Sequence, residues 1–211
     1  MTLIKVYKDL LKHHGHQDWW PASRSFKPRE WEVCIGAILT QNTAWGNVEL
    51  ALDNIYNARL LTVEDIAESD LRTLKKLIRP SGFFNQKSVK LRNLSRFVLS
   101  FGSFKNFKNK VTREQLLAIN GIGPETADSI LLYACGRPYF VVDAYTRRIF
   151  SRIGVLDGNN KYEEIRNIFE TNIPKDVELY KEYHALIVRH AKGCCRKLPN
   201  GKCVLLKYRH A

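Results

Sequence analysis

Long apolar runs are missing from this 211-residue sequence. No segment approaches the roughly 20 apolar residues that cross a bilayer, and residues 1–20 hold too short an apolar core for a secretion signal. Strand-like alternation of polar and apolar residues is also scarce, which disfavours a β-sheet protein. These absences predict an intracellular, helical protein that does not act in a membrane.

Cysteine is present, but not in the spacing of the common metal sites. Cys34 and Cys135 fall inside apolar helical segments, where a thiol acts as a small hydrophobic side chain. The other three cysteines are Cys194, Cys195 and Cys203. A four-thiolate zinc or iron–sulfur site needs four suitably spaced cysteines, and no C-x-x-C pair occurs. We therefore expect reduced thiols and no bound metal; a mixed site using His190 or His210 is an alternative that the pattern does not favour.

Acidic residues are too few to balance the basic ones. The 34 Lys and Arg residues against 21 Asp and Glu residues give a net charge of +13 and a pI near 9.6. Such an excess favours a polyanionic partner, namely DNA, RNA or, least of all, an acidic membrane surface. A basic face that is merely solvated is the alternative interpretation.

Helical periodicity is what the sequence has in abundance. Apolar residues recur at 3.6-residue spacing in four stretches, Trp31/Ile35/Ile38/Leu39, Val48/Leu52/Ile55, Leu71/Leu74/Leu77/Ile78 and Val89/Leu91/Leu94/Val98. Breaks fall at residues 13–28, 80–82, 102–110, 157–161 and 173–176. We predict an all-α protein with one good core or two small ones.

The most informative stretch is a glycine turn between two predicted helices. The first helix covers residues 112–119, with Thr112 and Gln115 in the positions of a capping box. The second helix begins at Pro124. Between them, Gly121 and Gly123 lack side chains, so their amides can approach a phosphate beside the positive end of a helix dipole. An ordinary helical hairpin with a glycine cap is the alternative.

Four motifs in order extend this pattern. The hairpin reads Leu116-x-x-Ile119-x-Gly121-Ile122-Gly123-x-x-Thr126-Ala127 and is followed by Val141-Val142-Asp143-x-x-x-x-Arg148. Upstream lie the segments 38–43 (ILTQNT) and 82–87 (GFFNQK), and downstream lies 184–192 (HALIVRHAK). Together they resemble the endonuclease III superfamily of DNA glycosylases, with its L-S-x-Q-T and G-F/Y-x-x-x-K-A segments, hairpin and catalytic aspartate. Within it, Trp19-Trp20-Pro21 and Trp45 look most like the small 3-methyladenine DNA glycosylase III group.

One departure from the family narrows the chemistry. Members that also cut the strand carry a lysine two residues after the second turn glycine, and its amine forms a Schiff base with the sugar C1′. This chain has Glu125 there, and a carboxylate cannot form that imine. The resemblance therefore implies a monofunctional, hydrolytic N-glycosylase with little or no strand-cleaving activity. Glu125 itself either lines the base pocket or is a favourable charge at a helix N-terminus.

A second departure concerns the cofactor. Many family members hold a [4Fe–4S] cluster on four cysteines, of which only Cys195 and Cys203 have counterparts here. We expect the iron–sulfur cluster to be absent and the protein to need no cofactor. Nearby basic side chains, Lys192 among them, are expected to stabilise this region or bind DNA in its place.

The resemblance assigns the chemistry to Asp143. Cleaving an N-glycosidic bond builds positive charge on the sugar, and a carboxylate below C1′ stabilises that charge and orients or deprotonates the attacking water. Taken alone, Asp143 also fits a helix cap or an ion partner of Arg147 or Arg148.

Aromatic side chains indicate the substrate class. An enzyme acting on duplex DNA must hold its target base in a pocket outside the helix. Trp19, Trp20, Pro21 and Trp45 are the expected pocket residues, together with Glu125 and Lys192. A purine alkylated at N3 or N7 is cationic, so an indole face attracts it, and its charge makes it a good leaving group. The alternative is that the Trp-Trp-Pro run anchors a loop in the core.

The remaining expected DNA contacts come from three segments. The family places the glutamine of its L-S-x-Q-T segment near the gap left by the flipped nucleotide, so Gln41 is expected to fill the stack and Asn42 to bond locally. In the hairpin, Gly121, Ile122, Gly123 and Thr126 are expected to meet DNA. Lys87 is expected to contact a phosphate or neighbouring carbonyl groups rather than to react.

The family architecture implies two helical lobes with the active cleft between them. One would be a helical barrel over residues 27–136, containing the hairpin at 112–135, and the other would combine 1–26 with 137–211 and carry Asp143. The expected activity is hydrolytic removal of alkylated purines such as 3-methyladenine in base excision repair, by a monomer that acts on damaged double-stranded DNA in the cytoplasm. A uracil/thymine mismatch glycosylase and a non-catalytic DNA-binding protein are the alternatives.

Overall fold

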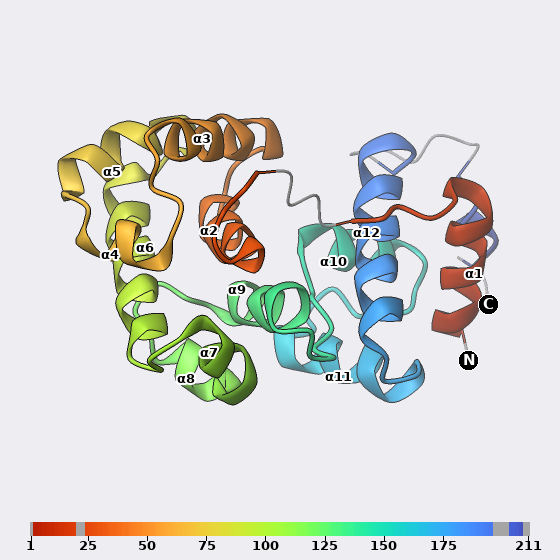
Figure 1. Cartoon of the computed structure of the whole chain (residues 1–211). Coiled ribbons are helices and arrows are strands. Elements are labelled where there is room, and N and C mark those ends of the chain that lie inside the picture. Colours follow the sequence, from red (N-terminus) through yellow and green to blue (C-terminus); the bar gives the residue numbers. More distant parts are fainter. Residues whose placement is uncertain (1, 20–23, 196–202, 209–211) are drawn as a thin grey trace. The chain divides into compact units, whose positions relative to one another are not determined.

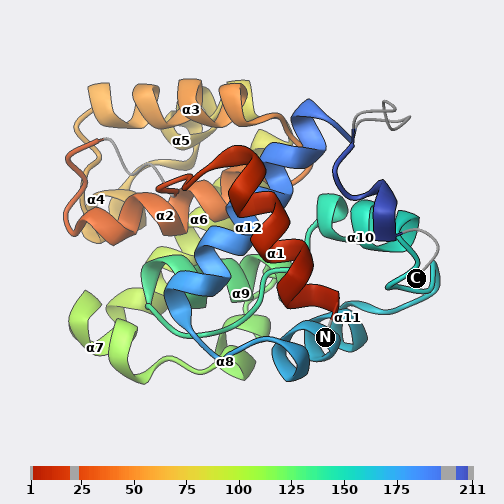
Figure 2. The same cartoon turned by 90° about the vertical axis from the view of Figure 1, so that its right-hand side faces the viewer.

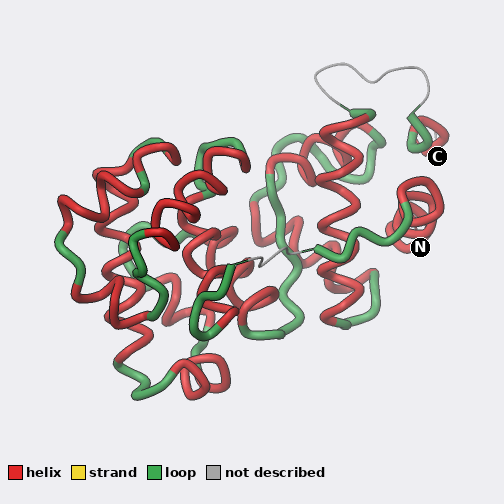
Figure 3. Tube along the Cα trace, turned by 45° about the horizontal axis from the view of Figure 1, so that its top comes forward, coloured by secondary structure: helices red, strands yellow, loops and turns green. Residues whose placement is uncertain are grey.

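The computed structural model describes residues 2–19, 24–195 and 203–208. Within these ranges the chain consists of helices joined by loops, without a named strand (Figure 3). One isolated parallel β-bridge, between Lys27 and Thr62, occurs in the described ranges. The prediction of an all-α protein is confirmed. Trp20 and Pro21, predicted to line the base pocket, lie outside the described residues.

The chain divides into two compact units, one formed by residues 22–136 and the other by 1–21 with 137–211. The first unit contains α2 (Arg29–Leu39), α3 (Trp45–Asn57), α4 (Val63–Glu68), α5 (Leu71–Leu77), η1 (Arg79–Ser81), α6 (Phe84–Leu99), α7 (Phe104–Lys110), α8 (Arg113–Leu117), α9 (Pro124–Ser129) and the π-helical turn η2 (Ile130–Ala134) (Figure 1). The second contains α1 (Thr2–His14), α10 (Ala144–Arg152), α11 (Tyr162–Asn172), α12 (Val177–Gly193) and η3 (Leu206–Tyr208).

Helix α2 forms the core of the 22–136 unit. From Val33 to Leu39 its residues are apolar on every side, and the whole stretch from Trp31 to Leu39 is buried against α3, α6, α9 and η2. The one charged residue in this stretch is Glu32. Its Oε1 forms an ion pair with Nη1 of Arg24 at 3.0 Å, which compensates for the burial of the carboxylate. The predicted apolar faces of α3 and α6 are buried as expected except at Val89, which is 39% exposed.

Aromatic rings fill the core of the other unit. Phe140 stacks on Phe169 with ring centroids 4.1 Å apart, and Tyr183 of α12 packs edge-on against both. Helix α1 lies alongside α12 (Figure 2), and the Tyr183 hydroxyl donates to the Leu3 carbonyl oxygen at 2.7 Å. This arrangement anchors α1 to the last long helix of the chain. None of the helices described is both long and apolar enough to cross a membrane.

Candidate active site

The glycine turn connects α8 to α9 as predicted, and local hydrogen bonds explain its shape. Thr112 and Gln115 form the predicted capping box, with N···O distances of 3.2 and 2.9 Å. Helix α8 ends at Leu117, two residues earlier than expected, and the Ile122 amide then donates to the Ile119 carbonyl oxygen at 3.0 Å. Helix α9 starts at Pro124, as expected. The starts of both hairpin helices are therefore specified by the residues that the sequence singles out, whereas the end of α8 is not.

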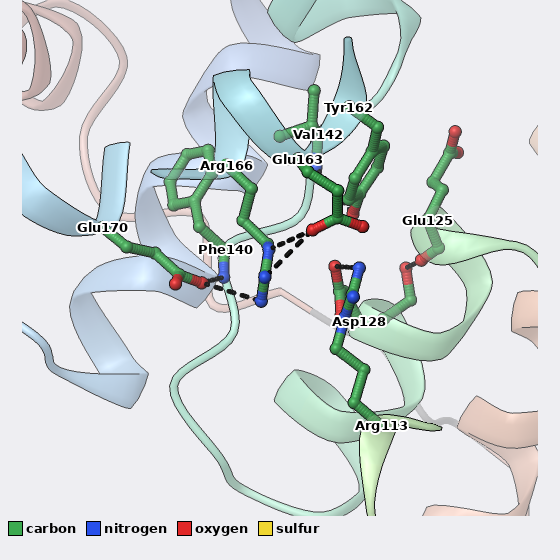
Figure 4. A network of polar contacts seen from close by, with 10 residues as sticks. Arg113, Glu125, Asp128, Phe140, Val142, Tyr162, Glu163, Arg166 and Glu170 are labelled. Atoms are coloured by element: carbon green, nitrogen blue, oxygen red, sulfur yellow. Dashed lines mark hydrogen bonds and ion pairs between the residues drawn. The ribbon is translucent and has the colours of Figure 1, made fainter. Parts of the chain in front are cut away.

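A buried ion pair holds the two hairpin helices together. Arg113 of α8 donates to both carboxylate oxygens of Asp128 in α9, at 2.6 and 3.1 Å (Figure 4). Asp128 is fully buried, so loss of the arginine would remove a charge that offsets the cost of burying the carboxylate. In the other unit, the same figure shows Arg166 between Glu163 and Glu170, while Glu170 also accepts the Phe140 amide at 2.8 Å.

The two turn glycines differ in what they require. Gly121 has φ +89°, and a Cβ there would lie 2.4 Å from Cε and 2.8 Å from Cγ of Lys90. Gly123 has an extended backbone, is exposed, and a Cβ there would meet nothing within 4 Å. Ile122 between them is buried and anchors the turn, so a contact of this residue with DNA would use its main chain. That contact stays a prediction. Gly121 thus serves the fold, whereas Gly123 keeps an accessible backbone.

We expect alanine at these two positions to separate stability from binding. Gly121→Ala strains the left-handed backbone and displaces Lys90, so Tm should fall by about 3 to 6 °C. Gly123→Ala should change Tm by less than about 2 °C but raise the Kd for duplex DNA about tenfold, because its methyl group crowds the amide that would meet a phosphate. Thermal unfolding and fluorescence anisotropy measure the two effects, and an unchanged Kd for Gly123→Ala would contradict the phosphate contact.

Gln41 is fixed against the hairpin. Its Nε2 donates to the Gly121 carbonyl oxygen at 3.2 Å and to the Thr126 hydroxyl at 2.9 Å, while its Oε1 accepts from Lys90 at 2.7 Å. Thr126 is buried and holds Gln41 through this bond. The next residue, Asn42, is exposed and has φ +53°, a backbone conformation that Asn tolerates better than most residues. The predicted stack-filling side chain thus belongs to an ordered network, and insertion into DNA would require these three bonds to break.

Lys87 bonds to neighbouring carbonyl groups, the second of the two roles expected for it. Its side chain is buried, and Nζ donates to the carbonyl oxygens of Leu39 at 2.8 Å and Ser81 at 2.6 Å. Burial, followed by the charge of Lys90, lowers the pKa of Lys87 to about 8. A phosphate contact by Lys87 is therefore wrong for this arrangement, because the amine that would make it is used to join the end of α2 to the Ser81 turn.

The Lys87→Met variant should consequently be a stability variant. Two buried carbonyl groups lose their charged donor, which costs about 2 to 4 kcal/mol and lowers Tm by about 5 to 15 °C. DNA affinity below the transition should stay within about twofold of the wild-type value. Lys76→Met, at an exposed lysine of the same unit, is the matched control and should leave Tm nearly unchanged. An unaltered Tm in Lys87→Met would show that the two bonds contribute little.

Asp143 caps α10 and keeps one oxygen for another partner. Its Oδ1 accepts from the Thr146 amide at 2.7 Å and from the Thr146 hydroxyl at 2.9 Å. Its Oδ2 lies 3.5 Å from Nε2 of His184 on α12. Burial opposes ionisation, but the contact with His184 and the bonds from Thr146 outweigh it and lower the pKa of Asp143. The group is an ionised carboxylate at neutral pH, with its position fixed by the helix that it caps.

The lowered pKa has a testable consequence for stability. Because Asp143 binds its proton more weakly in the folded chain than in the unfolded one, its stabilising contribution is present above the unfolded pKa of about 3.9 and is lost as pH falls through the folded value. The difference in unfolding free energy between wild type and Asp143→Asn should therefore shrink as the pH falls below about 4. Denaturant titrations at several pH values measure this difference, and a difference that persists unchanged below about pH 4 would contradict the lowered pKa of Asp143.

His184 is the site residue that the sequence analysis did not assign. It is buried on α12, and its ring lies 5.6 Å from that of Trp19, tilted by 41°. Asp143, His184 and Trp19 are therefore neighbours within one unit, although they are far apart in sequence. Asp143 pairs with His184 rather than with Arg147 or Arg148, the ion partners considered above. The sequence indicated His184 only as part of the 184–192 segment. The fold is needed to show that it lies beside the carboxylate of Asp143.

The other predicted pocket residues are distributed over both units. Trp45 is the first residue of α3 and is half-buried, and Glu125 is exposed in the first turn of α9, both in the 22–136 unit. Lys192 is exposed in the last turn of α12, in the same unit as Asp143. Their proposed roles at a base pocket stay predictions.

All five cysteines are free thiols. Cys34 and Cys135 are buried in apolar surroundings, as predicted. Cys195 accepts from Nη1 of Arg152 at 3.0 Å, and Cys203 lies 3.2 Å from Nε2 of His190. Burial, followed by the neighbouring histidines, lowers the pKa of His190 to about 4, so this imidazole is neutral at physiological pH. Near the end of the described chain, histidine and cysteine side chains thus lie close together, and the cysteines form no disulfide bond.

The helical fold, with its glycine hairpin and the aspartate that caps α10, is that of a helix-hairpin-helix protein. The family of HhH-GPD superfamily base excision DNA repair proteins matches residues 35–175. A Methanocaldococcus jannaschii protein whose name presents it as a candidate DNA repair glycosylase is 51% identical over 201 residues, covering 92% of this chain and 89% of its own. This chain belongs to the HhH-GPD superfamily. The two matches support its assignment as a DNA glycosylase of base excision repair.

Two solved structures place the fold within that superfamily. The crystal structure of a Helicobacter pylori 3-methyladenine DNA glycosylase bound to 1,N6-ethenoadenine is 35% identical and has a TM-score of 0.79, covering 90% of this chain and 96% of that one. A non-covalent endonuclease III–DNA complex has a TM-score of 0.81 at 19% identity, covering 98% and 93%. The first likeness supports the resemblance to the 3-methyladenine group, and the second concerns the fold.

Proposed function

We propose that this protein is a monofunctional DNA glycosylase that hydrolyses the N-glycosidic bond of alkylated, cationic purines such as 3-methyladenine and leaves an intact abasic strand. The observation that carries the proposal is the arrangement of Asp143. Its carboxylate is ionised and held by the bonds that it accepts from Thr146, and it lies next to His184, against which Trp19 packs. This combines a fixed negative charge with an aromatic surface.

Each part of this arrangement has a task in the reaction. The negative charge of Asp143 stabilises the positive charge that develops on the sugar, and it can accept a proton from the attacking water. Thr146 holds the carboxylate so that no reorganisation is needed at the moment of reaction. The indole of Trp19 attracts a cationic base by stacking and cation–π interaction. A positively charged base leaves readily, so a single carboxylate suffices.

The hydrolytic character rests on Glu125. It occupies the first turn of α9 at the position where lyase members of the family carry their amine nucleophile. Without that amine, water is the nucleophile that displaces the base. The substrate class is supported by the H. pylori glycosylase, whose structure contains an ethenoadenine base. No iron–sulfur cluster is proposed, since only Cys195 and Cys203 correspond to the family's cluster ligands.

A panel of duplexes tests this function. Each duplex carries one methylated purine, uracil, mismatched thymine or 8-oxoguanine, and strand breaks are measured with and without hot alkali. We expect release of 3-methyladenine or 7-methylguanine, with breaks that appear only after alkali. Release from G·U or G·T duplexes but not from methylated DNA would select a mismatch glycosylase instead. Binding without release of any base would select a non-catalytic DNA-binding protein.

A further inference from the structure

Histidine and cysteine side chains gather where α1 and α12 end. His13 and His14 are the last two residues of α1, and Cys194 directly follows α12. Both helices belong to the same compact unit and lie side by side (Figure 2). Residues about 180 positions apart in the sequence therefore meet at one place, outside the site described around Asp143.

The distances among these three side chains are those of potential metal ligands. One ligand atom from each of His13, His14 and Cys194 lies within 4.8 Å of the other two. Cys194 Sγ is 4.0 Å from Nε2 of His13. In a tetrahedral zinc site, Zn–N and Zn–S bonds of about 2.0 and 2.3 Å put neighbouring nitrogen and sulfur ligands about 3.5 Å apart. Small side-chain movements are thus enough to bring these atoms onto one ion.

A second layer of contacts fixes the group. Nδ1 of His190 lies 3.0 Å from Nε2 of His14, and the other nitrogen of His190 lies 3.2 Å from Sγ of Cys203. His190 is fully buried, so its ring cannot turn freely. Metal-binding histidines are commonly oriented by such a partner on their other ring nitrogen. The fold therefore holds the His14 ring in place through its Nε2 atom.

We propose that His13, His14 and Cys194 bind one zinc ion, with water at the fourth position. Two imidazoles and a thiolate suit Zn²⁺, whereas Mg²⁺ and Ca²⁺ prefer oxygen ligands, which the group lacks. On binding, the Cys194 thiol releases its proton to solvent and the sulfur forms the bond to zinc. The ion cross-links the end of α1 to the end of α12 and stabilises the unit that carries Asp143.

Cobalt binding to the full-length chain provides a direct test. After dialysis against a chelator, Co²⁺ titration should give one equivalent of binding with a thiolate-to-cobalt charge-transfer band, which Zn²⁺ then displaces. At a free zinc concentration 100 times its Kd, Tm should rise by about 5 to 10 °C. No saturable cobalt band, or a protein that purifies with iron and acid-labile sulfide, would overturn the proposal.

Matched variants test the ligand set. Cys194→Ser should abolish the charge-transfer band, whereas Cys195→Ser, at a neighbouring thiol held by Arg152, should retain it. His13→Ala should weaken zinc binding at least about tenfold, in line with removal of one ligand bond, whereas His16→Ala, at an exposed histidine nearby, should not. A band that survives in Cys194→Ser, or disappears in Cys195→Ser, would assign the metal to other ligands.

Discussion

Asp143→Asn should remove base release while leaving the fold intact. Loss of the negative charge and of the proton acceptor should lower the single-turnover rate on a methylated duplex by at least about 10³-fold. Asparagine caps helices as well as aspartate does, so the bonds from Thr146 can persist and Tm should change by less than about 3 °C. Rapid quench of base release, with thermal unfolding of the same preparation, measures both quantities.

Thr146→Ala is the control for this result. It removes the hydroxyl donor to Oδ1 but leaves the carboxylate and its main-chain cap bond in place. Its rate should fall by no more than about tenfold, which corresponds to one hydrogen bond. If Asp143→Asn were as active as Thr146→Ala, Asp143 would be a structural cap and the catalytic assignment would fail.

Glu125→Lys should create a covalent reaction that the wild-type protein lacks. A lysine at this position supplies the amine that lyase members of the superfamily use, so the variant should form an imine with the abasic sugar. Borohydride reduction should then trap a protein–DNA adduct and the strand should break without alkali. Gel electrophoresis of borohydride-treated reactions measures the trapped fraction, which should be at background for the wild type.

Glu125→Gln separates the gain of an amine from the loss of the carboxylate. It should yield no adduct, because an amide is not a nucleophile for the sugar. An adduct formed by the wild-type chain would show that another amine performs lyase chemistry and would overturn the hydrolytic assignment. Absence of an adduct in Glu125→Lys, with base release intact, would show that this position does not face the sugar.

Local rules predicted much of the fold because the relevant interactions lie within a few residues of one another. The Thr112–Gln115 capping box and the start of α9 at Pro124 are examples, since capping depends on near neighbours in sequence. The widening of the following helix into the π-helical turn η2 is not visible in the sequence, because Ile130–Ala134 is buried on all sides and shows no polar face.

The missed features all depend on distant contacts. For Lys87 the bonds to carbonyl groups were predicted, but the acceptor at the end of α2, 48 residues away, was not. His184 follows the apolar pattern of α12, and the sequence does not show that Asp143 caps a helix beside it. The same holds for His13 and Cys194, whose nearness depends on the pairing of α1 with α12.

The division of the chain has a consequence for biosynthesis. The 22–136 unit is continuous in sequence, whereas the other unit combines residues 1–21 with 137–211. Because domains fold as units while the ribosome elongates the chain, the continuous unit can complete its core first. Leu3, Val6 and Leu10 of α1 must wait for α12, which is translated more than 160 residues later. We therefore expect the nascent α1 to be a binding site for chaperones, although it is translated before the other helices described.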